Sequence, residues 1–412
     1  MVREARADVA GAEIARSEVA RREVVGTEVI VDVGPVAHGG FCVARHEGRA
    51  VFVRHSLPGE RVRAIVTEGT SRSRYWRADA VEVLDASADR VPAPCPYAAP
   101  GACGGCDWQH VSLDAQRRLK GAVVSEQLAR LAGLDVAVAV EAVPGDTDGL
   151  GWRTRVRFAV DASGHAGLRR HRSHEVVPVA DCLIAHPGVA APDVLSRTWS
   201  GTDEVVAVVS STGERVIVAG AGGASGPPFV TEGAAGRTWR VAADGFWQVH
   251  PGAADVLVGA VLEALGPSDG DSVLDLYAGV GLFAGAVAER VGPSGSVVAI
   301  ESDRQAVSDA RENLRDLPWV RVVAGQVDVR LRSRPADLVV LDPPRSGAGA
   351  RVVERIAACR PRAVAYVACD PAALARDIAT FATSGYRLAG LRAFDLFPMT
   401  HHIECVALLQ PE

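Results

Sequence analysis

The spacing of apolar residues changes twice along the chain, and the first part has the pattern of a small β-barrel. Between residues 24 and 85, short stretches of alternating apolar and polar residues are separated by glycine and proline. Barrels of this OB-like type often bind single-stranded nucleic acid, although a purely structural barrel fits the pattern equally well. We expect strands at Glu28–Val33, Ala50–Arg54, Arg61–Thr67 and Trp76–Leu84.

The middle of the chain mixes a loop, a helix and further strands. Residues 86–110 are rich in proline, glycine and cysteine, whereas Gln116–Leu131 places leucine and valine at helical spacing. Residues 150–245 have a β-rich pattern, and no internal repeat is present. In this part we expect strands at Thr154–Val160, Val205–Ser210, Arg215–Ala219 and Arg237–Val241.

From about residue 256 onward, apolar strand patterns alternate with helical ones, which predicts an α/β, doubly wound, Rossmann-like domain. The expected strands are Ser272–Leu276, Val297–Ile300, Val320–Val323, Leu338–Leu341, Ala363–Ala368 and Val406–Leu409. We therefore predict four regions: a flexible tail at 1–22, the barrel at 23–86, a β-rich central domain at 87–240 and the Rossmann-like domain at 241–412.

Composition and charge narrow the setting more than the function. The 412 residues exceed one ordinary domain, and the net charge of -6 neither favours nor excludes nucleic acid, since arginines cluster locally at 153–157 and 169–172. An apolar run of about 18 residues and a signal peptide are both missing, so we expect no membrane span and a cytoplasmic protein. In that compartment the eight cysteines are expected to be ligands, nucleophiles or packing residues rather than disulfides.

A glycine-rich loop predicts a nucleotide-like cofactor. Strand Ser272–Leu276 runs into Tyr277-Ala278-Gly279-Val280-Gly281, and the following strand ends at Glu301, which can accept the hydroxyls of an adenosine ribose. This fingerprint fits NAD as well as S-adenosylmethionine. The strand Leu338–Leu341, however, ends in Asp342-Pro343-Pro344-Arg345, and an acidic loop made rigid by proline favours a nucleobase methyltransferase over a dehydrogenase.

Two residues near the end of the chain fit covalent catalysis on a pyrimidine. Cys369 follows strand Ala363–Ala368 and precedes a helix, whose N-terminus is expected to lower the thiol pKa, and Glu404 enters the last apolar strand. A cysteine is more often a small buried packing residue. Uridine C5, however, needs a thiolate at C6 before it can attack a methyl sulfonium, and a base must then remove the C5 proton.

These motifs together resemble the RNA 5-methyluridine methyltransferases, over essentially the whole chain. The resemblance implies that Gln248, Tyr277, Glu301 and Asp342 contact S-adenosylmethionine, that Cys369 is the nucleophile and that Glu404 is the general base. His250, Leu282 and Asp370 stand where the family commonly has Asn. The matching segments are Phe246-Trp247-Gln248-Val249-His250, Asp275-Leu276-Tyr277-Ala278-Gly279-Val280-Gly281, Asp342-Pro343-Pro344-Arg345, Ala368-Cys369-Asp370-Pro371, Ala375-Arg376-Asp377 and Phe397-Pro398-Met399-Thr400-His401-His402-Ile403-Glu404.

A second group of cysteines suggests a metal centre. Cys95, Cys103 and Cys106 lie in one loop, Cys182 is the best fourth ligand, and four thiolates suit zinc or an iron–sulfur cluster. One CxxC with two distant single cysteines lacks the paired knuckles typical of structural zinc. The ribosomal-RNA branch of the resembled family carries a [4Fe–4S] cluster at matching positions, so we expect that cluster, with a structural role. A redox-active disulfide is the alternative, and we interpret Cys42, Cys359 and Cys405 as packing residues.

The expected substrate is RNA. The N-terminal barrel resembles the TRAM module, with Phe41, Arg45, Phe52 and Arg54 as candidates for stacking and phosphate contact. The tRNA branch of the resembled family generally lacks both barrel and cluster, so the resemblance implies 23S ribosomal RNA. We expect a flipped-out uridine as the target and a monomeric enzyme. The alternatives are uridine 54 of tRNA, a non-catalytic RNA-binding protein, and, least favoured, a dehydrogenase.

Overall fold

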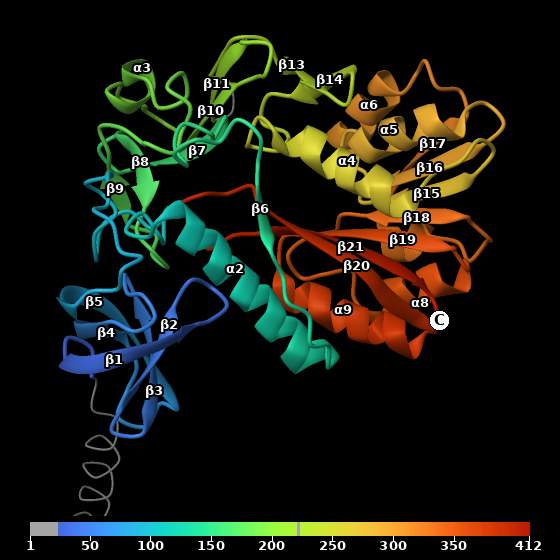
Figure 1. The fold of residues 1–412 in the computed structure, drawn as a ribbon. Coiled ribbons are helices and arrows are strands. Elements are labelled where there is room, and N and C mark those ends of the chain that lie inside the picture. The colour runs from blue at the N-terminus through green and yellow to red at the C-terminus, as the bar shows by residue number, and fades with distance from the viewer. Residues whose placement is uncertain (1–23, 221–222) are drawn as a thin grey trace, which may run out of the picture. The chain divides into compact units, whose positions relative to one another are not determined.

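The computed structural model describes residues 24–220 and 223–412 (Figure 1). The predicted tail at 1–22 lies outside the described residues. The described chain forms two compact units, the first comprising the residues up to Ala102 with Cys106–Ser112, the second comprising Cys103–Gly105 and Leu113–Glu412. Most of the predicted central domain and all of the predicted Rossmann-like domain fall in the second unit. The domain boundaries drawn from the sequence stay predictions.

The first unit is a closed barrel of five strands in the order β1-β2-β3-β5-β4, which confirms the OB-like expectation. Alternation along β1 buries Val29, Val31 and Val33 and turns the residues between them outward. The unpredicted strand β2 has only two strongly apolar residues, but the two-residue turn Glu47-Gly48 forces it to pair with β3. The strands are β1 Glu28–Val36, β2 Cys42–His46, β3 Arg49–Arg54, β4 Arg61–Glu68 and β5 Tyr75–Asp85.

The second unit begins with helix α2 (Leu113–Gln127), which continues as a π-helical turn over Leu128–Ala132 and stops at Gly133 in a left-handed conformation. Its buried face includes Val123 and Val124, as the apolar spacing predicts, and also two polar residues, Gln116 and Lys120. The helix packs against α9 (Pro371–Thr383). A buried lysine and a buried glutamine on one helix face require polar partners, and both find them in the segment that precedes the last strand.

The middle part of the second unit is an antiparallel sheet in the order β12-β11-β10-β7-β8-β9, followed by the hairpin β13–β14. The guanidinium of Arg155 in β7 is buried and donates to the carboxylate of Glu232 in β13 (2.9 Å), which ties sheet to hairpin. The elements are β7 Arg155–Val160, β8 Ala166–Arg169, β9 Val176–Pro178, α3 Pro192–Leu195, β10 Glu204–Val209, β11 Arg215–Ala219, β12 Gly223–Ser225, β13 Phe229–Ala234 and β14 Arg237–Ala242.

The C-terminal part is an eight-stranded sheet in the order β17-β16-β15-β18-β19-β21-β20-β6, in which the five strands from β17 to β19 are parallel. This arrangement confirms the Rossmann-like prediction. Strand β6 (Val140–Ala142) belongs to the predicted central domain but pairs with β20 at the sheet edge. The other strands are β15 Ser272–Leu276, β16 Ser296–Glu301, β17 Val320–Ala324, β18 Leu338–Leu341, β19 Ala363–Ala368, β20 Tyr386–Asp395 and β21 Glu404–Pro411.

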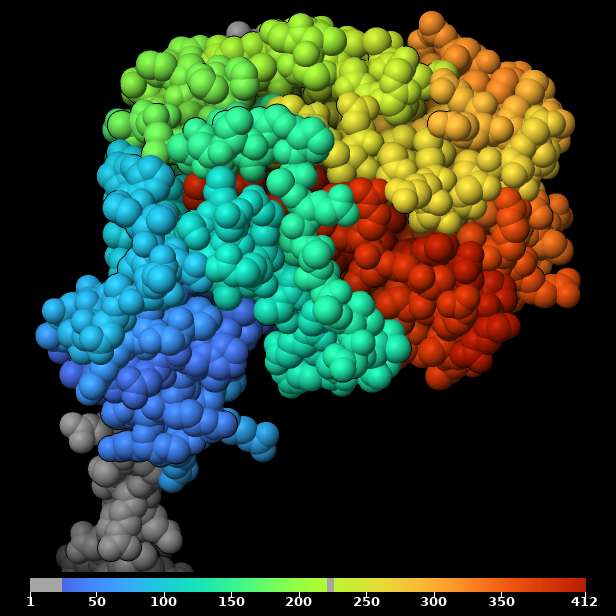
Figure 2. All heavy atoms as spheres, in the orientation of Figure 1, coloured from blue at the N-terminus to red at the C-terminus, as the bar shows by residue number. Residues whose placement is uncertain are grey.

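Helices cover both faces of this sheet and enclose two apolar cores. One core includes α4 and α5, and the other includes α8, α9 and α2. In Figure 2 the yellow atoms of α4 lie directly against the red C-terminal segment, in agreement with the contacts of α4 with β19 and β21. Among the described residues, no helix is both long and apolar enough to cross a bilayer. The remaining helices are α4 Ala253–Leu265, α5 Leu282–Val291, α6 Arg304–Asn313, α7 Val327–Arg330 and α8 Ala350–Ala358.

Candidate active site

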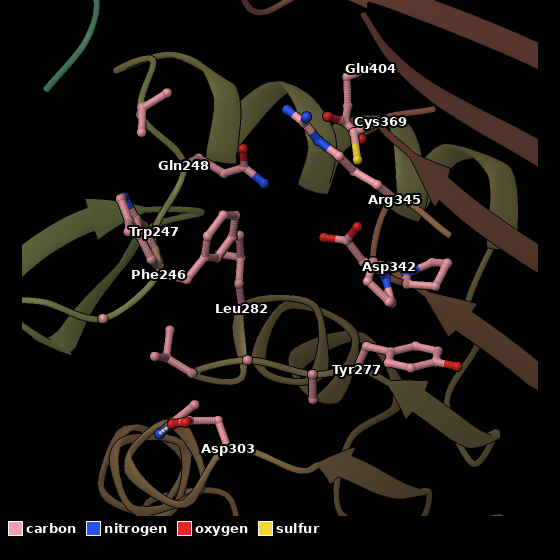
Figure 3. Close-up of a pocket in the computed structure, with 18 of the residues that line it drawn as sticks. Phe246, Trp247, Gln248, Tyr277, Leu282, Asp303, Asp342, Arg345, Cys369 and Glu404 are labelled. Atoms are coloured by element: carbon pink, nitrogen blue, oxygen red, sulfur yellow. Dashed lines mark hydrogen bonds between the residues drawn. The ribbon is translucent and has the colours of Figure 1, made fainter. Parts of the chain in front are cut away.

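A cavity of about 1140 Å³ opens at the carboxyl edge of the parallel strands, within the second unit (Figure 3). Loops that follow β14, β15, β16, β18 and β19 line it, together with the segment before β21. Ligands bind at this edge of doubly wound sheets, because the loops there diverge and leave a crevice. All six residues predicted for cofactor binding and catalysis line this one cavity: Gln248, Tyr277, Glu301, Asp342, Cys369 and Glu404.

The loop after β15 and the end of β16 form one preorganised wall. The Oε2 atom of Glu301 accepts a hydrogen bond from the backbone N–H of Gly279 (2.9 Å), and Oε1 accepts from the N–H groups of Ser302 (2.6 Å) and Asp303 (2.7 Å). These bonds fix the carboxylate at the cavity. Gly281 is required in this loop, because its φ is +96° and a Cβ there would lie 2.7 Å from Leu314 Cδ1.

Asp275 supports this wall from below, and sequence reasoning assigned it no role. Its side chain is buried, and Oδ2 accepts from the N–H of Ala284 at the start of α5 (2.7 Å). Burial raises the pKa of Asp275 to about 7, and the charges of Asp342 and Glu301 add to the effect. The available signal was one acidic residue in the otherwise apolar strand β15, where a carboxylate needs a partner or a task.

Asp342 follows β18, and its carboxylate points into the cavity between Tyr277 and Arg345 (Figure 3). Burial in the cavity wall raises the pKa of Asp342 to about 7. The cavity wall thus presents two acidic groups, Glu301 and Asp342, beside the glycine-containing turn after β15. This set fits a ligand with a ribose at one end and a positive charge at the other, as S-adenosylmethionine has.

Sheet pairing brings the predicted nucleophile and base together. Strands β19 and β21 are antiparallel, with Ala368 opposite Cys405, so the next pair at this edge is Cys369 and Glu404. Glu404 is only 4% exposed, and burial raises its pKa well above the ordinary value, while Arg345 opposes the effect. Figure 3 shows Cys369, Glu404 and Arg345 gathered at one end of the cavity, near Asp342.

The helix N-terminus that follows Cys369 does not leave the thiol with a lowered pKa, contrary to the expectation from the sequence. The pKa of Cys369 is raised to about 11, mainly by burial and also by the charges of Glu404 and Asp342, while Arg345 opposes the rise. The first turn of α9 is already capped by Asp370, whose carboxylate accepts from the N–H of Ala373 (2.7 Å). The carboxylate of Asp370 thus already occupies the helix N-terminus, and burial, together with the charges of Glu404 and Asp342, outweighs the helix dipole at the thiol.

The three departures from the family pattern have separate places. Asp370 caps α9, as an asparagine would. Leu282 lines the cavity at the start of α5. His250 is buried, accepts from the N–H of Gly252 (3.1 Å) and stacks on Trp152, and burial lowers its pKa. The histidine is therefore a neutral packing residue behind the cavity wall.

The four cysteines of the predicted metal centre divide between the units: Cys95 and Cys106 belong to the first, Cys103 and Cys182 to the second. Two of the four sulfurs accept local hydrogen bonds: Cys103 Sγ from the N–H of Gly105 (3.3 Å) and Cys106 Sγ from Nε2 of Gln109 (3.4 Å). In the parts of the chain that the structure describes, no group of three or more His, Cys, Asp or Glu side chains is arranged to hold a metal ion. The structure therefore does not show the predicted [4Fe–4S] cluster.

The barrel carries a cluster of aromatic rings on its strands. Phe52 contacts Phe41 and Tyr75 in edge-to-face geometry, with ring centroids 6.3 Å and 5.4 Å apart, and the guanidinium of Arg77 lies over Phe41 and Tyr75. Two predicted residues, Phe41 and Phe52, thus belong to this aromatic cluster. Arg45 is exposed. The prediction that Arg54 contacts phosphate is wrong. Its guanidinium is buried 3.6 Å from the carboxylate of Asp107 and is unavailable to phosphate.

Known protein families match segments of both units. The family profile described as TRAM domain matches residues 22–81, "Methyltransferase small domain" matches 252–362, and "tRNA (Uracil-5-)-methyltransferase" matches 317–412. The structure of Pyrococcus abyssi tRNA (uracil-54, C5)-methyltransferase, solved with S-adenosyl-L-homocysteine, has a TM-score of 0.69 at 22% identity. The match covers 92% of this chain and 99% of that one, which shows a shared fold.

Two sequence relatives decide the family. An uncharacterized RNA methyltransferase of Streptomyces avermitilis is 54% identical over 92% of this chain and 98% of its own length. Another, from Streptomyces coelicolor, is 53% identical over 92% of both chains. With the profile matches and the cavity geometry, this shows that the chain belongs to the family of S-adenosylmethionine-dependent RNA (uracil-C5-)-methyltransferases that carry a TRAM domain.

Proposed function

We propose that the protein methylates C5 of a uridine in RNA through a covalent bond between Cys369 and uridine C6. The observation that carries this proposal is the pairing of β19 with β21, which places a thiol and a buried carboxylate at the cavity wall that suits the methyl donor. A thiol and a carboxylate side by side in a cofactor-binding cavity can serve as the nucleophile and the general base that the reaction requires. When bound, the cofactor supplies an electrophilic methyl carbon.

The proposed reaction consists of addition, methyl transfer and elimination. The Cys369 thiolate adds to C6, and the C5–C6 electron pair forms an enolate. C5 of this enolate takes the methyl group as the bond between the methyl carbon and the sulfonium sulfur breaks, and S-adenosylhomocysteine leaves. Glu404, as a carboxylate, removes the C5 proton, the double bond re-forms, and the C6–S bond breaks to return the thiolate. Arg345 opposes the raised pKa of both groups, and it therefore favours their charged, reactive forms.

We expect cofactor affinity to depend on pH through Asp342. A carboxylate with a pKa of about 7 must ionise to face a cation, so affinity for S-adenosylmethionine should rise with pH up to about 7 and then level off. S-adenosylhomocysteine has a neutral sulfur and the same amino group, so its affinity should vary less. Calorimetric titration of both ligands between about pH 5.5 and 8.5 measures the difference, and Asp342→Asn should remove it. Identical profiles for both ligands would contradict this role of Asp342.

Of the two RNA classes, we propose 23S ribosomal RNA as the substrate. The support is the combination of a barrel with the cysteine-rich loop, which resembles the ribosomal-RNA branch of the family. The name of the Pyrococcus abyssi protein favours the alternative, uridine 54 of tRNA. Mass-spectrometric mapping of 5-methyluridine in both RNAs, with and without the gene, decides between them. Loss of the methyl group from tRNA alone would overturn the ribosomal assignment.

The aromatic cluster on the barrel is proposed as part of the RNA-binding surface. Stacking of one base on an aromatic side chain contributes about 1–3 kcal/mol. We therefore expect Tyr75→Ala, at a residue that is 42% exposed, to weaken RNA binding by roughly 5- to 150-fold. The matched control is Ile30→Ala, which removes an exposed apolar side chain from β1 of the same barrel. Fluorescence anisotropy with a labelled RNA fragment measures both, and equal affinity for the two variants would refute the assignment.

The iron–sulfur cluster also stays a proposal, supported by the spacing of Cys95, Cys103, Cys106 and Cys182. Iron and acid-labile sulfide assays on anaerobically purified protein should find both in equal amounts, and Cys182→Ser should lower both. Stoichiometric zinc, or neither metal nor sulfide, would count against it. No step of the proposed reaction depends on this centre.

A further inference from the structure

We infer that helix α2 positions the catalytic base: Gln116 and Lys120, one turn apart on its buried face, hold the segment Asp395–Thr400 that leads into Glu404. We call these two residues the α2 clamp. This inference rests on the proposed role of Glu404, and the experiment below separates the two. Both residues are positioning residues, because neither lines the cavity.

Lys120 makes the first contact. Its Nζ lies 2.5 Å from Oδ1 of Asp395 and 3.0 Å from the carbonyl oxygen of Phe397, and the lysine and aspartate side chains are 0% and 1% exposed. An ion pair this deeply buried loses the hydration of both charges, and such pairs often stabilise a fold no better than apolar residues of the same size. We therefore expect this ion pair to contribute mainly by fixing the geometry at the end of β20.

Gln116 makes the second contact. Its Oε1 accepts a hydrogen bond from the backbone N–H of Met399 (2.7 Å), and its Nε2 lies 3.4 Å from the Met399 sulfur. Met399 has a φ of +65°, a left-handed conformation that is unfavourable for a long side chain and persists only when its surroundings enforce it. A Cβ on Gly149 would lie 3.0 Å from both Met399 and Pro398, so the turn is also enclosed on a second side.

A continuous chain of hydrogen bonds leads from the clamp toward the base. The Phe397 carbonyl that accepts from Lys120 also accepts from the Thr400 hydroxyl (2.7 Å), and this hydroxyl accepts from the N–H of His402 (3.2 Å). Glu404 begins β21 two residues later. Phe397, Thr400, His402 and Glu404 all line the cavity. The clamp is thus connected, bond by bond, to the backbone that presents the carboxylate.

The reaction offers a way to tell positioning from mere stability. Attack by Cys369 and methyl transfer do not need Glu404, whereas removal of the C5 proton does. RNA that carries 5-fluorouridine has no C5 proton to remove, so it stops every active enzyme as a covalent complex. A displaced base should therefore slow turnover on uridine RNA and leave the trapping of 5-fluorouridine RNA unchanged.

The test uses two variants of the full-length protein designed to keep the fold. Gln116→Met retains the shape of the side chain without its hydrogen bonds, and the double variant Lys120→Met with Asp395→Leu replaces the ion pair by apolar groups. For both we expect turnover to fall on the order of 100-fold, the effect of a misplaced catalytic group, with covalent complex accumulating on ordinary uridine RNA. Arg130→Met is the matched control, because it removes a 70% exposed cation from the turn that continues α2.

Each outcome has one meaning. Unchanged trapping with slow turnover and accumulated complex supports the clamp. Turnover equal to that of the wild type overturns the clamp and leaves the proposed function standing. Trapping and turnover that fall together, with a lower melting temperature, show a purely structural helix and also overturn it. A wild-type enzyme that traps no 5-fluorouridine RNA would refute the proposed function and the clamp together.

Discussion

Replacing Cys369 by alanine should abolish methylation of RNA and leave S-adenosylmethionine binding intact. Without a thiolate at C6, uridine C5 is too poor a nucleophile to take a methyl group, so the variant loses the reaction itself rather than an accelerating factor. For comparison, removal of a catalytic nucleophile from a hydrolase costs on the order of 10⁶-fold. The cofactor wall at Glu301 and Asp342 does not depend on the thiol, so calorimetry should return the wild-type affinity.

The neighbouring thiol provides the control for this prediction. Cys405 lies in β21 directly after Glu404, is fully buried and has a raised pKa because of burial. Cys405→Ala removes a neighbouring thiol that is more deeply buried than Cys369, and we expect this variant to keep its activity. Methyl transfer from radiolabelled cofactor and gel-stable complexes with 5-fluorouridine RNA report on both variants. A methylated product from Cys369→Ala would disprove covalent catalysis at this residue.

Sequence patterns located the strands that matter most, because parallel strands buried on both faces are continuous apolar runs. Leu338–Leu341 and Ala363–Ala368 were predicted with the bounds that the structure has, each ended by a proline-containing loop. Strand β20 was missed because Arg387 and Arg392 interrupt its apolar pattern and a bulge at Gly390 shifts its register. Edge strand β6 has three residues, too few for any periodicity.

The candidate site could be assembled from sequence because the carboxyl ends of neighbouring strands share one edge of the sheet. The sequence could not predict pKa shifts and ion pairs that depend on distant segments of the chain. The thiol pKa was expected to fall because of the local helix at Pro371, whereas burial raises it, and Glu404 in β21 and Asp342 after β18 add to the rise. The partners of Gln116 and Lys120 are 283 and 275 residues away, and no local pattern reveals such contacts.

Replacing Glu404 by glutamine should leave the first methyl transfer possible and block the release of product. Glutamine keeps the shape of the side chain and its place opposite Cys369, but it cannot take the C5 proton. We expect turnover to fall by about 10²–10⁴-fold, the usual contribution of a general base, and a methylated covalent complex to accumulate on ordinary uridine RNA. Denaturing gels with radiolabelled methyl donor measure both quantities.

The same variant also tests the electrostatics of the cavity, because it should make the Cys369 thiol more reactive while it lowers turnover. The Glu404 charge is one of the causes that raise the Cys369 pKa to about 11, so its removal should lower that pKa. Alkylation of Cys369 by iodoacetamide should then begin at lower pH in Glu404→Gln than in the wild type, although turnover is lost. If Glu404 served only to hold the strand in place, its replacement would not change the balance between adduct and product. Slow turnover without accumulated complex would therefore assign proton removal to another group.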